Sequence, residues 1–201
     1  MKLSIFALSA SVLALACSSS MSTIKALAAD IPSYAKKPFD VTMTSKNQGA
    51  ENTIRTSCDG KGHVRSEVDA GGQKSISMMD YPGNTITSLI VAQKMMIKMP
   101  MPKQEDQITD AESAKKANAK DLGAKVMNGH PCHGYELKKG DTVSQTWIGD
   151  DIHYLVHSEI TSPKIKSVTD LKSYSAKAPE ASLFDIPPGY KEMKMPGAAS
   201  K

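Results

Sequence analysis

The chain has 201 residues, of which 40% are hydrophobic and 23% are charged, and its formal net charge is +4. This length suits one domain with a sizeable core, and the composition is that of an ordinary globular protein. Because the lysines are scattered among acidic residues, the charge pattern shows no footprint for nucleic acid. The sequence also contains no glycine-rich phosphate loop and no internal repeat.

The amino terminus has the pattern of an export signal. Lys2 precedes an apolar run, Leu3 to Ala16, that is too short for a transmembrane helix but typical of a signal-peptide core. A small-x-small site makes residues 1–28 an expected signal peptide and residues 29–37 an exposed lead-in. The alternative is a lipoprotein signal that ends before Cys17, which would then be lipidated. In that case the amino terminus would attach the protein to a membrane.

Export changes the interpretation of the cysteines. Once Cys17 is removed or lipidated, Cys58 and Cys132 remain as an even pair in an oxidising compartment, which predicts a structural disulfide. The alternatives are a reactive thiol and a metal ligand. Cys132 lies between His130 and His133, but a zinc site would need a fourth ligand and a free thiolate.

From residue 38 onward, apolar and polar residues alternate in short runs separated by turn residues. This pattern predicts one domain over residues 38–196, built from β-strands and followed by a tail at 197–201. Strands are expected near residues 39–44, 52–58, 64–68, 125–127, 132–137, 142–148, 152–160 and 165–174, besides those of the stretch described next.

The most distinctive stretch is Lys74–Met101, a meander rich in methionine. Two β-type runs flank the turn residues 80–84, and a third run begins at Met95. Because strand side chains alternate, Met95, Ile97, Met99 and Met101 are expected on one face. Thioether side chains are adaptable and apolar, so this face suits either an irregular core or an apolar binding surface.

One segment departs from the β pattern. Residues Glu105 to Leu122 are rich in alanine and charge, contain no proline or glycine, and place acids early and lysines late, which favours a helix that ends at Gly123. The sequence therefore predicts a mainly β fold of the α+β class. It is expected to be a curved antiparallel sheet that forms an open half-barrel, with one mid-chain helix over its concave face.

Four short motifs carry a resemblance to a known family. These are Met79–Pro82, Lys98–Pro100, Asn128–Cys132 and Phe184–Tyr190. With the order of elements, they resemble the outer-membrane lipoprotein-sorting superfamily of LolA- and LolB-like proteins, and more closely one of its uncharacterised branches. The resemblance implies a half-barrel whose concave face holds acyl chains or other apolar ligands. It also implies a location in the periplasm or at the outer membrane of a Gram-negative bacterium.

These expectations define a candidate site and function. We expect an exported, non-enzymatic protein that binds an apolar or lipidic ligand, with no cofactor and no protein partner that the sequence can name. No nucleophile elbow or metalloprotease motif is present. The expected ligand-lining residues, with the helix as a lid, are Met78, Leu89, Met95, Ile97, Met99, Ile108, Trp147 and Tyr154.

Two other functions remain open from the sequence. One is a copper-handling protein, since thioethers bind Cu(I), with Met95, Met99, Met193, Met195 and His130 as ligands. Methionines two residues apart on a strand are about 6.5 Å apart, however, so one strand alone cannot surround an ion. The other is a structural envelope protein whose core fills its own concave face. His153 and His157 are expected to face solvent.

Overall fold

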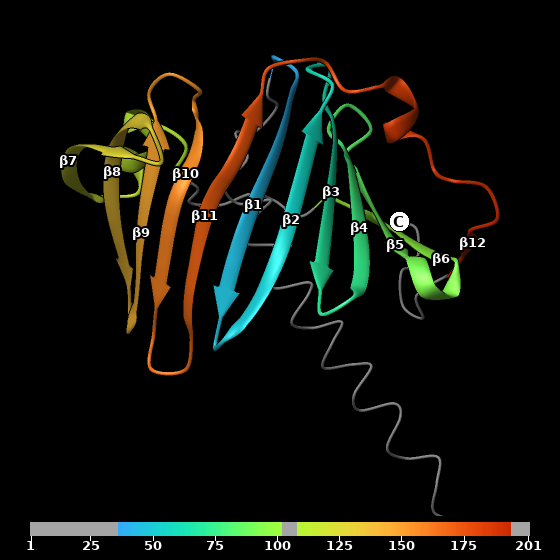
Figure 1. Cartoon of the computed structure of the whole chain (residues 1–201), viewed down its shortest axis with the longest axis horizontal. Helices are drawn as coiled ribbons and strands as arrows, with labels where there is room; N and C mark the ends of the chain where they lie inside the picture. The colour runs from blue at the N-terminus through green and yellow to red at the C-terminus, as the bar shows by residue number, and fades with distance from the viewer. Residues whose placement is uncertain (1–35, 102–107, 194–201) are drawn as a thin grey trace, which may run out of the picture.

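The computed structural model describes residues 36–101 and 108–193, and its strands form one 12-stranded sheet (Figure 1). The sheet order is β12-β6-β5-β4-β3-β2-β1-β11-β10-β9-β8-β7. The elements are β1 (Phe39–Asn47), β2 (Ala50–Cys58), β3 (His63–Ala70), β4 (Gln73–Asp80), β5 (Thr85–Ile90), η1 (Val91–Gln93), β6 (Met95–Pro100), α2 (Ala111–Lys116), β7 (Lys120–Met127), β8 (His130–Lys139), β9 (Thr142–Gly149), β10 (Tyr154–Thr161), β11 (Lys166–Ser175), η2 (Ala181–Phe184) and β12 (Lys191–Glu192). The expected signal peptide, the lipidation site Cys17, Met195 and the tail lie outside the described residues.

Two meanders placed side by side make up the sheet. Strands β1 to β6 pair in sequence order, as do β7 to β11, and the antiparallel pairing of β1 with β11 joins the two sets. The short strand β12 pairs in parallel with β6. The sheet stays open, with β12 and β7 as its edges, so the prediction of a mainly β, open antiparallel half-barrel is confirmed.

Side-chain alternation gives the sheet an apolar inner face. Val41 in β1 defines this face, and the strand registers extend it across both meanders. The main core cluster contains buried side chains from strands β1 to β4 and from β8 to β11. Its buried members are Phe39, Val41, Met43, Ile54, Cys58, Val64, Val68, Met79, Cys132, Ile148, Tyr154, Leu155, Val156 and Leu171. Burial of this much apolar surface is the main stabilising contribution to the fold.

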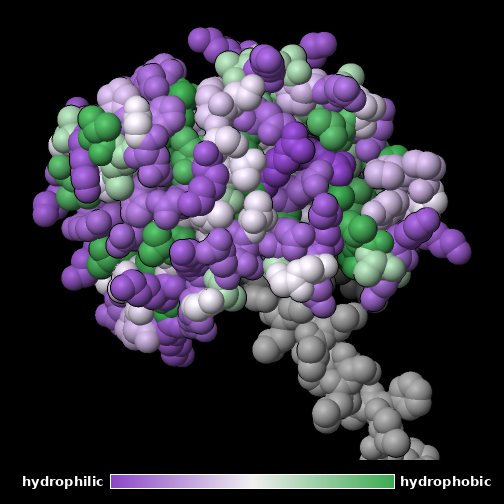
Figure 2. Space-filling model, in the orientation of Figure 1, coloured by the Kyte–Doolittle hydropathy of each residue, from purple (hydrophilic) through white to green (hydrophobic). Residues whose placement is uncertain are grey.

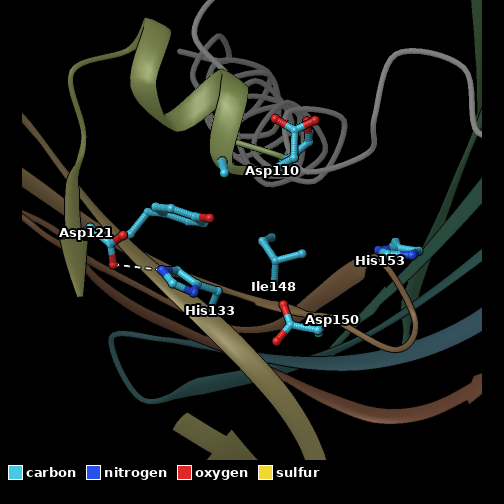
Figure 3. Close-up of a pocket in the computed structure, with 10 residues that line it drawn as sticks. Asp110, Asp121, His133, Ile148, Asp150 and His153 are labelled. Carbon is cyan, nitrogen blue, oxygen red and sulfur yellow. Dashed lines mark hydrogen bonds and ion pairs between the residues drawn. The ribbon is translucent and has the colours of Figure 1, made fainter. Parts of the chain in front are cut away.

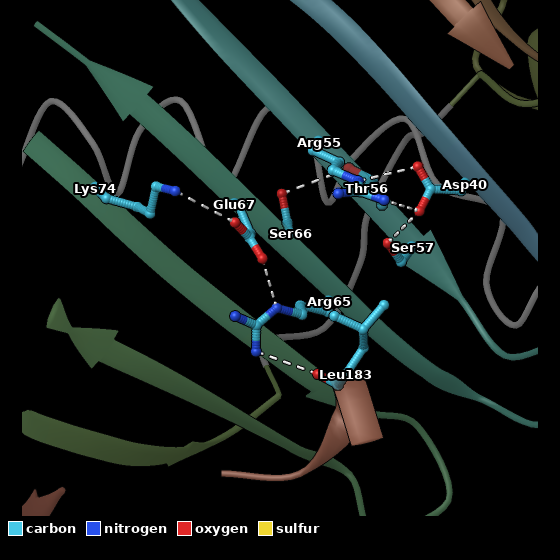
Figure 4. Close-up of polar contacts among 9 residues, drawn as sticks. All are labelled: Asp40, Arg55, Thr56, Ser57, Arg65, Ser66, Glu67, Lys74 and Leu183. Carbon is cyan, nitrogen blue, oxygen red and sulfur yellow. Dashed lines mark hydrogen bonds and ion pairs between the residues drawn. The ribbon is translucent and has the colours of Figure 1, made fainter. Parts of the chain in front are cut away.

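The opposite, outer face is polar over the middle strands. Arg55 donates two hydrogen bonds to the carboxylate of Asp40, at 3.1 and 2.8 Å, and Ser57 donates a third at 3.0 Å (Figure 4). On the neighbouring strand β3, the Arg65 guanidinium donates to the Glu67 carboxylate at 2.8 Å. Figure 2 shows the same character on the face in view, which is largely hydrophilic with small hydrophobic patches.

The C-terminal segment crosses the outer face of the first meander. The Arg65 guanidinium donates to the Leu183 carbonyl at 3.1 Å (Figure 4). The ring of Phe184 lies 6.5 Å from that of His63. Beyond these contacts, the Lys191 amide donates to the Lys94 carbonyl at 2.9 Å, which fixes β12 along β6. On this same face Ile76, Thr87 and Leu89 are buried. We call these three buried side chains the outer core, because they lie apart from the main core cluster.

The helix is shorter than predicted. Among residues 108–122 of this range, which the structure describes, only Ala111–Lys116 is α-helical. Asn118, with a φ of 54°, lies between this helix and β7. Residues 120–122 of the expected helix belong to β7, because their backbone groups hydrogen-bond to β8 and this tertiary pairing overrides helix propensity. The expected residues Glu105 to 107 lie outside the described part. Among residues 36–101 and 108–193, no helix has the length and apolarity needed to cross a membrane.

The outer core makes a testable contribution to stability. Leu89 is only 1% exposed, so truncating it in Leu89→Ala is expected to lower the free energy of unfolding by about 2–5 kcal/mol. Urea unfolding followed by circular dichroism measures the change. The matched control is Ile165→Ala, at a side chain that is 47% exposed, and its effect should stay within about 0.5 kcal/mol. If the two substitutions lowered the free energy of unfolding equally, Leu89 would not contribute to stability as a buried side chain of the outer core.

Candidate functional site

The methionine-rich meander supplies a row of apolar side chains on the inner face. The β5–β6 register pairs Ile90 with Met95, Ser88 with Ile97, and Ile86 with Met99. Ile86 in turn pairs with Met79, a member of the main core cluster, so Met95, Ile97 and Met99 share that face. All three are half-buried. The sequence-based prediction that they lie on one face is therefore confirmed.

Two other expected lining residues lie on the outer face. Met78 pairs with Thr87, and Leu89 pairs with Met96, which places both opposite the methionine row. Trp147 lies on β9, where it pairs with Gly134 and His157, and it packs against the main core cluster. Its ring lies so close to Gly134 that a Cβ there would approach ring carbons at 2.7 Å, and Lys125 lies 5.5 Å from the ring centroid.

The remaining two expected lining residues face inward but at separate places. Tyr154 is buried in the main core, where its ring lies 5.1 Å from Phe39 and 6.4 Å from Tyr174. Ile108 is buried with Tyr135 in a second cluster, beneath α2. The structure thus brings Met95, Ile97 and Met99 together and distributes the other five residues over three further locations.

The expected disulfide is not formed in the structure. Cys58 and Cys132 both belong to the main core cluster, but β2 and β8 are separated in the sheet by β1, β11, β10 and β9. The thiol of Cys132 donates to the carbonyl of His130 at 3.3 Å. Burial raises the pKa of each of these two cysteines.

The proposed copper ligands are only partly assembled. Met193 directly follows β12, and its amide donates to the Met96 carbonyl at 2.8 Å. Continuing the β12–β6 register to this residue places Met193 on the inner face with Met95. His130 instead lies on β8 and contacts Asp151 at 2.8 Å. Within the described residues, no three or more His, Cys, Asp or Glu side chains are grouped closely enough to hold a metal ion.

The two remaining histidines differ in exposure. His153 is exposed, as expected, in the turn before β10. His157 is half-buried on the outer face, where it contacts Asp170 at 2.7 Å and Glu159 at 3.3 Å, so the prediction that it faces solvent is wrong. Its neighbours on β11 and β10 supply the partners that sequence spacing could not show.

A pocket of about 390 Å³ lies where α2 faces β8 and β9. Figure 3 shows Asp110 on the α2 side, His133 and Asp150 opposite, and Asp121 and His153 at the two ends. Ile148 and Tyr135 also line it. Ile148 belongs to the main core cluster and Tyr135 to the cluster beneath α2, so the pocket marks the junction of the two cores.

Hydrogen bonds keep two of the pocket's carboxylates ionised. Asp121 accepts from the Gly123 amide at 2.6 Å and contacts His133 Nε2 at 2.7 Å, and these contacts lower its pKa. Asp110 caps α2 by accepting from the Ser113 amide at 2.8 Å, which lowers its pKa as well. The pocket is therefore an acidic depression in a protein whose net charge is +4.

Sequence reasoning did not find this pocket. In the sequence, Asp110 lies within the range of the predicted helix, and His133 appears only beside Cys132 in a possible zinc site. Recognising residues 120–127 as a strand would have helped, because the β7–β8 register places Asp121 opposite Tyr135. The signal in the sequence is the alternation of Leu122, Ala124 and Val126 after Asn118.

Comparisons with known proteins give structural matches only. No protein-family model matches the sequence, and no curated protein matches it. An uncharacterised conserved protein from Thermus thermophilus has a similar structure, with a TM-score of 0.62 and 8% identity over 79% of this chain and 90% of the other. MucB of the Pseudomonas aeruginosa MucA/MucB complex matches with a TM-score of 0.52 and 13% identity, over 76% of this chain and 56% of the other.

A domain from Vibrio parahaemolyticus assigned to outer-membrane lipoprotein sorting also matches. Its TM-score is 0.36 and its identity 9%, over 83% of this chain and 95% of the other. At these identities the likenesses concern the fold. The structure is an open, mainly antiparallel sheet, which is the architecture that the resemblance to the lipoprotein-sorting superfamily implied.

The capping carboxylate at the pocket predicts a pH-dependent stability. Asp110→Ala is expected to lower the free energy of unfolding by about 0.5–2 kcal/mol at pH 7, because α2 loses its N-cap. Since the pKa of Asp110 is lower in the folded state, its contribution is present above the unfolded-state pKa of about 3.9 and is lost as pH falls through the folded value.

Urea unfolding from pH 7 to pH 3 measures this difference. The gap between the wild type and Asp110→Ala should narrow toward pH 3. Asp141→Ala is the control, because Asp141 is an exposed aspartate in the β8–β9 turn, and it should change stability little at any pH. A gap that stays constant with pH would show that the carboxylate does not cap the helix.

Proposed function

We propose that this protein is an exported, non-enzymatic binding protein that holds an apolar or lipidic ligand on the inner face of the half-barrel, in the periplasm or at the outer membrane. The observation that carries the proposal is the row formed by Met95, Ile97 and Met99. These side chains lie on the inner face yet are only half-buried, so part of their apolar surface remains accessible. Accessible methionine surfaces adapt to ligands of irregular shape.

Two further observations support this function. The fold is the half-barrel that the resemblance to the lipoprotein-sorting superfamily implied, and it is shared with MucB, although the chain spans little more than half of MucB. The amino-terminal sequence also has the pattern of an export signal. Both fit a protein that works outside the cytoplasm and handles apolar molecules.

Native mass spectrometry of protein isolated gently from its own host tests the proposal. An extra mass that matches a lipid and disappears on organic extraction is the expected result. Copper handling is the second candidate, because Met193 joins Met95 and Met99 on one side of the β6 edge. A bound copper ion in place of a lipid would favour it. A bare chain would contradict both.

A charge placed in the methionine row should remove ligand binding. Met99→Lys is expected to abolish retention of a radiolabelled acyl lipid while the far-ultraviolet circular dichroism stays unchanged, because an ammonium would be buried against the apolar chain. Met96→Lys is the matched control, since it makes the same change on the same strand but on the outer face. Normal retention by a folded Met99→Lys protein would exclude this row as the binding surface.

A further inference from the structure

A row of four hydroxyl side chains crosses the inner face of the first meander. Successive strand registers pair one hydroxyl with the next from β2 to β5, and the four residues are Thr56, Ser66, Ser77 and Ser88. Paired residues point to the same face of a sheet, and Thr56 also pairs with Val41, which defines the inner face. We call these four residues the hydroxyl row.

Apolar side chains flank the hydroxyl row along the strands. Two positions away on the same face, β2 carries Ile54 and Cys58, and β3 carries Val64 and Val68. All four of these flanking side chains are buried in the main core cluster. Hydroxyl groups in such surroundings are cut off from water, so each of them needs a hydrogen-bond partner.

The hydroxyl of Ser77 lacks such a partner. Thr56 donates to Ser66 at 3.5 Å (Figure 4), whereas Ser77 Oγ is fully buried and forms no hydrogen bond with any described residue. Within the described chain, only Asn47 Oδ1, beside the β1–β2 turn, shares that condition. Because an unpaired buried hydroxyl costs free energy, the row contains a hydrogen-bonding position that a bound molecule can satisfy.

The hydroxyl row continues directly into the methionine row. Ser88 pairs with Ile97, the central residue of the methionine row, and both are half-buried while Ser77 is fully buried. Accessibility therefore increases from Ser77 toward the β6 edge. Neighbouring strands lie about 4.8 Å apart, so the backbones at Ser77 and Ile97 are about 10 Å apart. A ligand that packs on the methionine row can reach Ser77 along this line.

The chemistry of the hydroxyl row favours a neutral acceptor. A serine hydroxyl can donate one hydrogen bond to a carbonyl oxygen. The four hydroxyl residues and the residues that flank them on the inner face carry no charge, and Arg65 and Glu67 of β3 lie on the opposite face. A carboxylate at this place would be buried without a counter-charge, which is costly, whereas the carbonyl of an ester or amide is uncharged.

We propose that the hydroxyl row receives the acyl carbonyl of a lipidic ligand, with Ser77 donating a hydrogen bond to it while the acyl chain packs on the methionine row. Esters and amides of fatty acids share this carbonyl, and free fatty acids, which carry a carboxylate, are disfavoured. This inference rests on the proposed function and narrows its ligand from any apolar molecule to an acyl derivative.

Equilibrium dialysis of the purified protein with two tritium-labelled probes tests the proposal. 1-Dodecanoylglycerol contains the acyl carbonyl, and 1-O-dodecylglycerol has a methylene group in its place. The ester should bind about fivefold more tightly than the ether, the usual effect of one neutral hydrogen bond. Equal binding of the two would overturn this inference and leave the proposed function intact. Binding of neither would contradict the proposed function, and the inference with it.

Two further probes separate the possible sources of the carbonyl. Dodecanoate should bind more weakly than the ester, and tighter binding of dodecanoate would overturn the assignment of a neutral acceptor. The amide N-(2,3-dihydroxypropyl)dodecanamide has the same chain and the same carbonyl as the ester. Whichever of the ester and the amide binds more tightly identifies the class of acyl derivative that the site prefers.

Matched variants locate the carbonyl. Ser77→Ala should bind the ester and the ether equally, with the affinity for the ether unchanged from the wild type. Because this substitution removes an unpaired hydroxyl, the urea midpoint of the free protein should not fall. Ser158→Ala is the control, since it removes another buried serine hydroxyl, from β10 in the second meander, and should keep the fivefold preference.

Three results with these variants would overturn the assignment to Ser77. One is a preference for the ester that persists in Ser77→Ala, and another is an equal loss of the preference in Ser158→Ala. The third is a lower urea midpoint for Ser77→Ala, because it would show that the hydroxyl already has a partner in the free protein.

Discussion

The pairing of β1 with β11 is the contact on which the rest of the sheet depends. Every other antiparallel pair joins strands that follow one another in the sequence, so each can form from local chain alone. β1 and β11 come from opposite ends of the described chain, and ordering them costs the entropy of closing a long loop. Their union gives two meanders one interior, in which Met43 and Leu171, paired across the junction, are both buried. The β1–β11 pairing therefore sets where the methionine row of the first meander lies relative to the pocket of the second.

Much of the fold follows from short-range patterns. Alternation located most strands and correctly placed Met95, Ile97 and Met99 on one face, because a two-residue period is a property of the strand itself. The face of Met78 and Leu89 could not be read in the same way. Both faces of β4 and β5 carry apolar residues, and the buried residues of the outer face lie on the same side of the sheet as the returning C-terminal segment.

The pocket could not be predicted from the sequence. The pocket residues extend from Thr109 to His153 and meet only through the β7–β8 and β8–β9 registers, so no local motif marks them. The alanine- and charge-rich composition after residue 110 favoured a helix through Leu122. Pairing with β8 outweighed that helix propensity. Where a stretch can form either a helix or a strand, its tertiary contacts decide which of them forms.

The two edges of the open sheet bear on how the protein avoids self-association. An unpaired edge strand is a template for another chain, and an open half-barrel has two of them. β12 covers the β6 edge with only two residues, and β7 carries a bulge between Asp121 and Gly123, where Gly123 has a φ of 78°. Lys120 and Lys125 add charge to β7, although Val126 is 71% exposed. Irregular geometry and lysine at a sheet edge make the addition of a strand from another copy unfavourable.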